Sequence, residues 1–173
     1  TEALDLEATQ DAIQRMRPQV DAFAVSGYMS VRNPEQELAV RDLVSRLTGY
    51  PVVCGHQLSG DLGVYERTVT AVLNARLIPL IARLIDAVKQ SLTSRGIAAP
   101  LMVVKGDGGL ISETVARQRP IETILSGPAA SVVGAWDLSG RRGVWVVVDE
   151  AHISTLAVAE EMGPAFSDGV RIV

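Results

Sequence analysis

The longest regular pattern in this sequence is helical and runs from about Glu66 to Ser94. Apolar residues recur there at steps of three and four, the spacing that places them on one face of a helix. They are Val69, Val72, Leu73, Leu77, Leu80, Ile81, Leu84, Ile85, Val88 and Leu92. Pro79 falls inside the pattern, and because proline lacks a backbone N–H it predicts a kink or a division into two helices. So long an apolar face has to be covered by other elements.

Helix and strand patterns alternate on both sides of this stretch. Helices are expected from Asp5 to Met16 and from Asn33 to Gly49, where Asn33 can cap, Pro34 fits the first turn and Gly49 can end the helix. Strands are expected in "DAFAVSGY", "PVVCG", "APLMVVKGDGG" and "RGVWVVVDE", with "HISTLAVAEE" as an antiparallel neighbour of the last. The segment "PIETILSGPAASVVGAWDL" is interpreted as a strand, a Ser-Gly-Pro turn and a helix.

The residues available for a core favour the same class of fold. Hydrophobic residues make up 47% of the chain but aromatic residues only 4%, so the core has to be built from Val, Leu, Ile and Ala. That mixture suits strands covered on both faces by helices. We therefore expect an α/β fold.

Charge and targeting patterns exclude several partners. The formal net charge is −4, and no dense basic run is present, so neither nucleic acid nor an anionic membrane is favoured. The first ten residues do not resemble a signal peptide, and the longest uninterrupted apolar run, "VWVVV", is far too short to cross a bilayer. The single cysteine, Cys54, fits a reducing compartment. A cytoplasmic protein is the expectation.

The letters DEAH at residues 149–152 match a motif that marks a metal-holding acidic loop in one class of helicases. Such a motor also needs a glycine-rich phosphate loop ending in Lys-Ser or Lys-Thr. The sequence contains no G-x-x-x-x-G-K-[ST]. The helicase interpretation is therefore rejected.

Two glycine-containing segments are candidate ligand loops. "KGDGG", residues 105–109, follows an expected strand, the usual place for a ligand loop in α/β folds, although a plain turn explains the same glycines. "LSGPAAS", residues 125–131, places Ser126 and Gly127 at an expected helix start, where backbone N–H groups can bind an anion. A capped helix without a ligand accounts equally well for the second segment.

Cys54 and His56 suggest a metal site or a thiol–imidazole pair, but two ligands alone make a poor metal site. A core cysteine and a loop histidine are the favoured interpretation. Ser59 and Asp61 are interpreted as turn formers. No G-x-S-x-G elbow is present, so a serine hydrolase lacks its usual anchor.

Longer strings resemble the hydantoinase/oxoprolinase family. They are "AVSGYMSVRNPEQELAVRDLVSRLTGYPVVCGHQLS", "YERTVTAVLNARLIPLIARLIDAV", "PLMVVKGDGGLIS" and "RPIETILSGPAASVVGA". The resemblance is colinear from about Ala3 to Val173, and "NARLIPLI", "GDGGL" and "ETILSGPAAS" are its most specific parts. It implies a partial actin-like ATPase fold of the ribonuclease H-like type, a mixed sheet with flanking helices. Residues 1–62 would end the first lobe, and residues 63–173 would supply a long helix and the start of the second lobe.

The resemblance also implies a function. Members of the family open cyclic amides such as hydantoins or 5-oxoproline with ATP and a divalent metal, often together with a second, larger subunit. A second hydantoinase-type subunit or a homo-oligomer is therefore an expected assembly, and a small cyclic amide an expected substrate. The nucleotide- and phosphate-binding residues implied are Lys105, Gly106, Asp107, Gly108, Ser126, Gly127, Asp149, Ser154 and Thr155.

One motif departs from the family pattern. Where the family has Asp-Ile-Gly-Gly-Thr-Thr-Thr-Asp, residues 149–156 read Asp-Glu-Ala-His-Ile-Ser-Thr-Leu, so DEAH is a substituted phosphate loop. Ala151 and His152 replace glycines that let the backbone approach phosphate, and Glu150 adds negative charge. Removing one charge-assisted hydrogen bond to a phosphate would weaken binding by roughly 1.5–3 kcal/mol.

The isolated chain is therefore expected to be inactive as a cyclic-amide hydrolase. The alternative is a non-catalytic binding or assembly module derived from the family. A third possibility is a serine- or metal-dependent hydrolase that uses Ser59, His56 or Cys54 without ATP.

Overall fold

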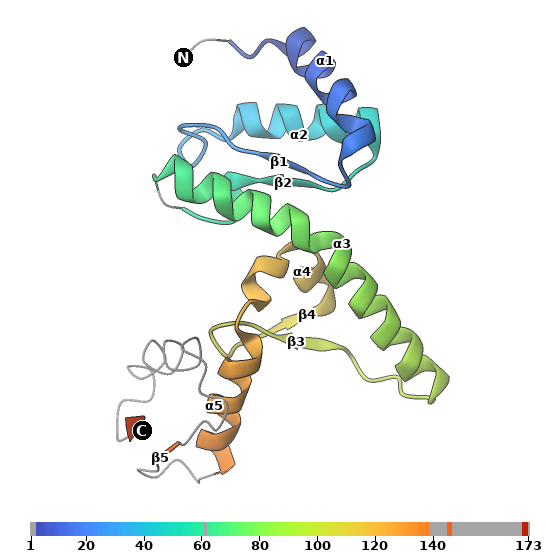
Figure 1. Cartoon of the computed structure of the whole chain (residues 1–173), viewed down its shortest axis with the longest axis vertical. Helices are drawn as coiled ribbons and strands as arrows, with labels where there is room; N and C mark the ends of the chain where they lie inside the picture. The colour runs from blue at the N-terminus through green and yellow to red at the C-terminus, as the bar shows by residue number, and fades with distance from the viewer. Residues whose placement is uncertain (1–2, 61, 139–144, 147–170, 173) are drawn as a thin grey trace. The chain divides into compact units, whose positions relative to one another are not determined.

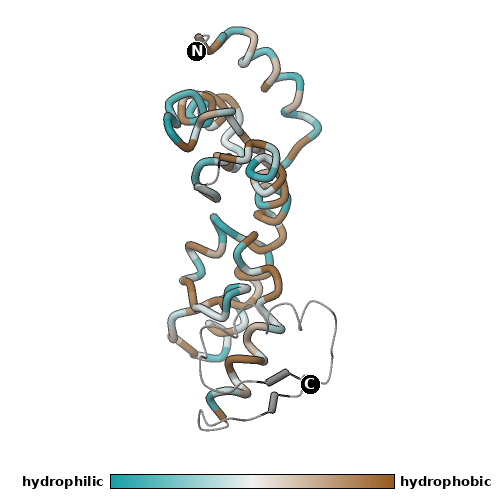
Figure 2. The backbone as a smooth tube through the Cα atoms, turned by 90° about the vertical axis from the view of Figure 1, so that its left-hand side faces the viewer, coloured by the Kyte–Doolittle hydropathy of each residue, from teal (hydrophilic) through white to brown (hydrophobic). Residues whose placement is uncertain are grey.

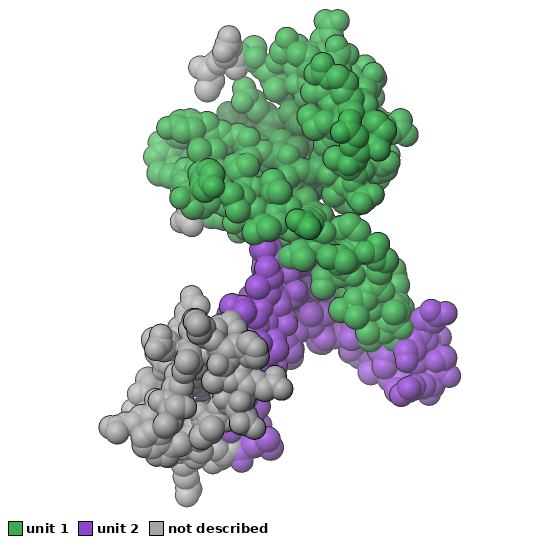
Figure 3. Space-filling model, viewed as in Figure 1, with its two compact units in different colours: residues 1–88 green, residues 89–173 purple. Residues whose placement is uncertain are grey.

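The computed structural model describes residues 3–60, 62–138, 145–146 and 171–172 (Figure 1). The chain divides into two compact units, residues 1–88 and residues 89–173 (Figure 3). The division falls within the longest helix, α3 (Val64–Ser94). The expected lobe boundary near residue 62 stays a prediction from the family resemblance.

Unit 1 is a β–α–β arrangement preceded by a helix. Its elements are α1 (Leu6–Met16), a 3-10 helix (Arg17–Gln19), β1 (Phe23–Val25), α2 (Glu35–Thr48), β2 (Val52–Cys54), a 3-10 helix (Gly55–Gln57) and most of α3. Strands β1 and β2 are parallel, with Phe23 opposite Val52 and Val25 opposite Cys54. Helices α2 and α3 cover opposite faces of this pair of strands (Figure 1).

Local signals fix both ends of α2. The helix begins at Glu35 with Pro34 as its N-cap, one residue after the predicted cap, and the Asn33 side chain accepts a hydrogen bond from the N–H of Glu35 at 3.0 Å. At the other end Gly49 has φ of +68°, and its N–H donates to the carbonyl of Ser45. Glycine adopts this left-handed conformation without the Cβ penalty of other residues, so the predicted end of the helix is confirmed.

Two small hydrophobic cores lie on the two faces of the β1–β2 pair. On the α2 face, Ile13, Phe23, Leu43 and Val44 are buried together. On the α3 face, Val53 packs with Ala71 and Ala75, whose small side chains let the helix lie close to the strands. Full burial of a Val, Leu or Phe side chain contributes about 1.5–3 kcal/mol, so these residues hold the layers together.

Helix α3 continues through Pro79 as one helix, so of the two predicted outcomes, a kink or a division, the division does not occur. Hydrophobic residues predominate along it (Figure 2), and an 18-residue window reaches a mean hydropathy of 1.5. By length and composition alone α3 is able to cross a membrane, although its apolar residues are interrupted by polar ones. Core helices of other proteins pass the same test, so this is weak evidence for a membrane span.

Unit 2 begins with the end of α3 and contains a short hairpin. Its elements are β3 (Met102–Val104), β4 (Leu110–Ser112), α4 (Glu113–Gln118), a 3-10 helix (Pro120–Thr123), α5 (Ser126–Leu138), β5 (Trp145–Val146) and β6 (Arg171–Ile172). β3 and β4 are antiparallel, whereas β5 and β6 are parallel. Strand β5 lies inside the strand predicted from "RGVWVVVDE", and its predicted neighbour "HISTLAVAEE" is outside the described residues.

The strand predicted at the start of "PIETILSGPAAS" is wrong. Pro120 begins a 3-10 helix there, which suits its fixed φ, and the hydroxyl of Thr123 donates to the carbonyl of Pro120 at 2.7 Å. The predicted Ser-Gly-Pro turn is the first turn of α5.

Candidate functional site

The Lys105–Gly109 segment is the turn of the β3–β4 hairpin. The N–H of Lys105 donates to the carbonyl of Gly109 at 2.8 Å, and the N–H of Gly109 donates to Oδ1 of Asp107 at 2.8 Å. Gly108 has φ of +81°, a conformation that side chains disfavour. These glycines therefore form a tight turn, whether or not the turn also holds a ligand.

The same turn packs directly against the segment that leads into α5. The N–H of Gly106 donates to the carbonyl of Glu122 at 2.8 Å. A Cβ placed on Gly106 would lie 2.2 Å from the carbonyl oxygen of Ile124, which leaves no room for a side chain. The structure thus brings the two predicted glycine segments together, because Ile124 and Leu125 directly precede Ser126.

The start of α5 is open. Leu125 has φ of +62° and is the one non-glycine residue with positive φ among those described. The helix then begins at Ser126, and a Cβ on Gly127 would meet no atom within 4 Å. Pro128 has no N–H, so the first backbone donors of the helix are those of Ser126 and Gly127. A small anion is the type of ligand that such a helix start accepts.

Charges around the hairpin turn are paired. Nζ of Lys105 lies 2.6 Å from Oδ2 of Asp107 and 4.0 Å from Oε2 of Glu122, and Arg119 lies 3.2 Å from the other oxygen of Glu122. The hydrogen bond between Lys105 and Asp107 raises the pKa of the lysine and lowers the pKa of the aspartate. Both groups are charged at neutral pH. Such an exposed pair contributes only about 0.2–1 kcal/mol, so an incoming anion can compete for Lys105.

The described residues therefore include six of the nine that the sequence indicates for nucleotide or phosphate binding. Lys105, Gly106, Asp107 and Gly108 lie in the hairpin turn, next to the segment that leads into Ser126 and Gly127. Asp149, Ser154 and Thr155 lie outside the described residues.

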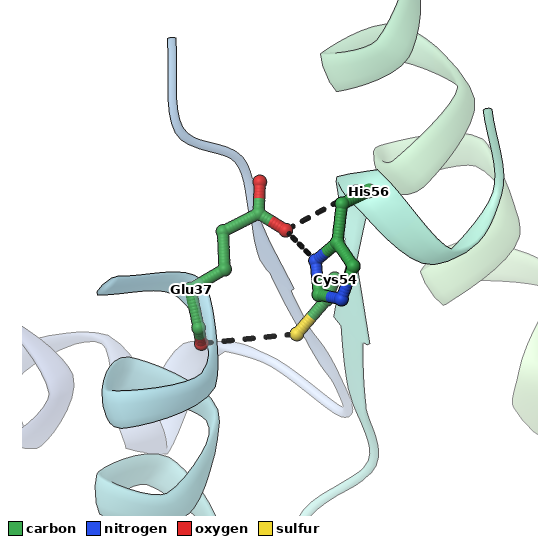
Figure 4. A group of neighbouring side chains, drawn as sticks. All are labelled: Glu37, Cys54 and His56. Atoms are coloured by element: carbon green, nitrogen blue, oxygen red, sulfur yellow. Dashed lines mark hydrogen bonds and ion pairs between the residues drawn. The ribbon is translucent and has the colours of Figure 1, made fainter. Parts of the chain in front are cut away.

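A second group of chemically active side chains lies in unit 1, at the ends of β1 and β2 (Figure 4). Glu37 of α2 is 1% exposed, and its Oε1 accepts a hydrogen bond from the N–H of Gly27 at 2.7 Å. Its Oε2 accepts from the N–H of His56 at 3.1 Å and lies 2.5 Å from Nδ1 of the same histidine. Cys54, fully buried, donates from Sγ to the backbone carbonyl of Glu37 at 3.8 Å.

Glu37 is not among the functional residues predicted from the sequence. A signal was present, because Glu37 lies three and seven residues before Val40 and Val44, which places it on the apolar face of α2. An acid on that face is buried and needs hydrogen-bond partners. The partners come from loops that are distant in the sequence.

The geometry of this group is that of a hydrogen-bonded cluster. Glu37, Cys54 and His56 bring three ligand atoms within 4.8 Å of one another, as a metal site requires. However, two oxygen or nitrogen ligands of one tetrahedral zinc lie about 3.3 Å apart, given bonds of about 2.0–2.1 Å. The 2.5 Å between Oε2 and Nδ1 is a hydrogen-bond distance instead.

The pKa values agree with this interpretation. Burial opposes ionisation of Glu37, but hydrogen bonds from Ser30, His56 and the backbone of Gly27 and His56 outweigh it and lower its pKa. Burial raises the pKa of the Cys54 thiol to about 11, so it is protonated at neutral pH and is a weak nucleophile. The cluster ties the loops that follow β1 and β2 to helix α2.

Helix α3 is attached to the same loop. Arg67, 1% exposed, donates from Nη2 to the carbonyls of Gly27 at 2.7 Å and Tyr28 at 3.2 Å. The hydroxyl groups of Thr68 and Ser26 are hydrogen-bonded to each other at 2.7 Å. The turn after β1 is therefore held by α2 from one side and by α3 from the other.

Comparison with known proteins identifies relatives of this chain. Residues 67–150 match the model of a family described as Hydantoinase/oxoprolinase. The alpha subunit of caprolactamase from Pseudomonas jessenii is 35% identical over 130 residues, which are 74% of this chain and 19% of that protein. The gamma subunit of acetophenone carboxylase from Aromatoleum aromaticum is 29% identical over 133 residues, 73% of this chain and 18% of that protein.

A solved structure shows the same fold. The structure of the ATP-dependent caprolactamase from Pseudomonas jessenii matches 85% of this chain with a TM-score of 0.76 and 31% identity. The match covers 22% of that chain, so the present chain spans about a fifth of the length of these relatives. It confirms the expected class, part of an actin-like ATPase fold with mixed α/β structure.

Proposed function

The chain belongs to the hydantoinase/oxoprolinase family as a partial segment of it, and on that premise we propose that it forms part of an ATP-dependent enzyme that opens cyclic amides. The similarity to caprolactamase, in sequence and in structure, is the observation that carries this proposal. The acetophenone carboxylase gamma subunit is also related, at 29% identity. A lactam and a ketone both present a carbonyl oxygen, so activation of a carbonyl compound is the chemistry that the two relatives would share.

Unit 2 contains groups that suit a polyphosphate. The N–H groups of Ser126 and Gly127 and the ammonium of Lys105 are donors for phosphate oxygens. Asp107 and Glu122 supply carboxylate oxygens, the ligands that a divalent cation prefers. Bound ATP would supply a phosphoryl group that makes the amide carbonyl more electrophilic. The role of this chain would be to hold the phosphates and the cation and to keep Lys105 charged.

A partner polypeptide is part of the proposal, because the caprolactamase relative is itself named as a subunit. The substituted loop at residues 149–156 lacks both family glycines, so residues 1–173 alone would not bind nucleotide tightly enough for catalysis. The same substitution favours a second candidate function, a non-catalytic assembly module within such an enzyme.

A cytoplasmic location remains part of the proposal, and rests on composition alone.

The test is an assay of ATP-dependent ring opening with caprolactam, hydantoin and 5-oxoproline. It is made on residues 1–173 alone and on the assembly purified gently from the native source. We expect no turnover by the isolated chain and ATP-dependent ring opening by the assembly. Turnover by the isolated chain that Asp149→Ala abolishes would contradict the expected inactivity. Carboxylation of a ketone by the assembly, without ring opening, would reject the cyclic-amide substrate.

A binding measurement tests the phosphate groups separately. In the absence of divalent cations, we expect Lys105→Met to weaken binding of tripolyphosphate and Asp107→Asn to strengthen it, each by up to about fivefold, the equivalent of an exposed ion pair. Lys89→Met is the matched control, because Lys89 forms a similar exposed pair with Glu113 on α4. Isothermal titration calorimetry gives the affinities. Equal effects of the two lysine variants would reject the role of Lys105.

A further inference from the structure

His56 places an oriented imidazole between a buried acid and solvent (Figure 4). Its Nδ1 lies 2.5 Å from Oε2 of Glu37. An ionised carboxylate only accepts hydrogen bonds, so the proton of the neutral ring is on Nδ1. Nε2 then carries the lone pair, which the geometry of the ring directs away from Glu37. The Glu37 side chain is 1% exposed and the His56 side chain 17%.

Nε2 of His56 is available to a ligand. Within the described part of the chain its ring forms one hydrogen bond, from Nδ1 to Glu37. A buried Nε2 would therefore be a buried nitrogen without a partner, and no histidine nitrogen of that kind occurs among the described residues. Solvent thus reaches Nε2, and the N–H or O–H of a ligand can reach it in the same way.

The pair lies at the position where α/β folds bind ligands. The connection after β1 leads to α2 on one face of the strands, and the connection after β2 leads to α3 on the opposite face. Where the connections of neighbouring parallel strands diverge in this way, ligands bind at the carboxyl ends of the strands. Gly27 follows β1 and His56 follows β2, and their N–H groups donate to the two oxygens of Glu37.

The attachment of the two loops to α2 does not require an imidazole. The N–H groups of Gly27 and His56 already bind one oxygen of Glu37 each, and a hydroxyl or an amide side chain could supply a further donor. A neutral imidazole differs because it donates from one nitrogen and presents an oriented acceptor at the other. A carboxylate that orients an imidazole through Nδ1 is a recurrent arrangement in sites where Nε2 contacts a ligand.

We propose that Nε2 of His56 binds the ring N–H of the cyclic-amide substrate, with Glu37 as the residue that positions the imidazole. The choice of substrate rests on the proposed function. Caprolactam, hydantoin and 5-oxoproline each carry an N–H beside a carbonyl group. A hydrogen bond from this N–H to Nε2 polarises the amide and increases the negative charge on the carbonyl oxygen, which favours its attack on a phosphoryl group. A ketone has no such N–H, so the site would select amides.

The experiment is a titration of the full chain with caprolactam, followed by nitrogen NMR. The chain contains two histidines, so ¹⁵N-labelling of histidine gives few signals, and those of His56 are the ones lost in His56→Asn. At a pH of about 8.5 an ordinary histidine is neutral. We expect the Nε2 signal to be that of an unprotonated nitrogen and to move as caprolactam binds. N-methylcaprolactam, which lacks the N–H, should bind at least about tenfold more weakly.

Two substitutions at His56 separate binding from folding. His56→Asn keeps a donor for Glu37 near the position of Nδ1 but has no atom at the position of Nε2. It should weaken caprolactam binding by about two- to tenfold, the equivalent of one hydrogen bond. His56→Gln, whose amide oxygen can reach the position of Nε2, should retain more of the affinity. Isothermal titration calorimetry gives the affinities, and urea denaturation should show both variants to be folded.

Four results would each overturn the proposal. They are an Nε2 signal that caprolactam does not move, a ring protonated on both nitrogens at that pH, equal binding of caprolactam and its N-methyl analogue, and equal affinities of the native chain and His56→Asn. Binding requires neither ATP nor turnover, so it is distinguished from the ring-opening assay. Caprolactam binding at His56 in a chain whose assembly opens no ring would reject the proposed function and leave the binding site established.

Discussion

Glu37 and Arg67 hold the two backbone groups of one residue, Gly27. The N–H of Gly27 donates to Oε1 of Glu37 at 2.7 Å, and its C=O accepts from Nη2 of Arg67 at 2.7 Å. Both side chains are 1% exposed. A buried acid and a buried base thus share the turn that follows β1, and each satisfies hydrogen bonds that burial makes costly to lose.

The hydrogen bonds of Glu37 and Arg67 to the backbone of Gly27 form a clamp, and the first prediction concerns this clamp. Glu37→Gln retains the shape of the side chain but removes the charge that accepts hydrogen bonds from Gly27 and His56. We expect the free energy of unfolding to fall by about 1–3 kcal/mol. Glu35→Gln, on the exposed side of the same helix, is the control and should change it by less than about 0.5 kcal/mol. Urea denaturation gives both values, and equal losses would show that Glu37 contributes no more than a surface acid.

The second prediction concerns pH. The pKa of Glu37 is lower in the folded protein than its ordinary value, so the folded state binds the proton less readily than the unfolded state. Its contribution to stability is therefore complete above the ordinary pKa of glutamate and is lost as the pH falls through the lower, folded value. We expect the difference in unfolding free energy between the native chain and Glu37→Gln to shrink as the pH decreases from about 7 to about 3. A constant difference over that range would contradict the prediction.

The third prediction compares two glycines. In Gly106→Ala the new Cβ would lie 2.2 Å from a backbone oxygen of Ile124, so the hairpin turn and the segment before α5 have to separate. We expect a loss of about 1–3 kcal/mol in unfolding free energy. Gly127→Ala meets no atom within 4 Å and lies in the first turn of a helix, so it should be neutral or stabilising by up to about 1 kcal/mol. Thermal denaturation of the two variants side by side checks the order.

The fourth prediction concerns the thiol of Cys54. Its pKa of about 11 leaves about 0.1% as thiolate at pH 8, and the side chain is fully buried. We expect Ellman's reagent to react with it only in denaturant or at the rate of unfolding. Reaction in the folded state as fast as with a free cysteine peptide would show that the end of β2 opens readily.

Elements with local determinants could be predicted from the sequence. Asn33 and Gly49 set the ends of α2 through interactions within a few residues, and the glycines of residues 105–109 indicated a turn. The strand predicted at the start of "PIETILSGPAAS" is wrong, because the fixed φ of Pro120 suits the start of a 3-10 helix as well as an extended segment. The residues next to Pro120 in the sequence do not distinguish the extended conformation from the 3-10 helix.

The interactions that build the candidate sites could not be predicted in this way. The clamp on Gly27 joins residues from three elements, and the fit of Gly106 against Ile124 depends on how the hairpin and α5 pack. Such interactions arise from tertiary packing, which hydrophobic periodicity does not specify. Glu37 is the partial exception, because its place on the apolar face of α2 was visible in the sequence.

The clamp on Gly27 also implies an order of events during folding. Glu37 is 10 residues from Gly27 in the sequence, whereas Arg67 is 40 residues away. Closing the longer loop costs about 1.2 kcal/mol more in chain entropy, since each doubling of loop length costs about 0.6 kcal/mol. The Glu37 hydrogen bond should therefore form early, as α2 packs on β1, and the Arg67 hydrogen bond later, when α3 docks. The turn after β1 reaches its final form only when α3 docks. The end of β1 is therefore completed by a helix that follows it by about forty residues in the sequence.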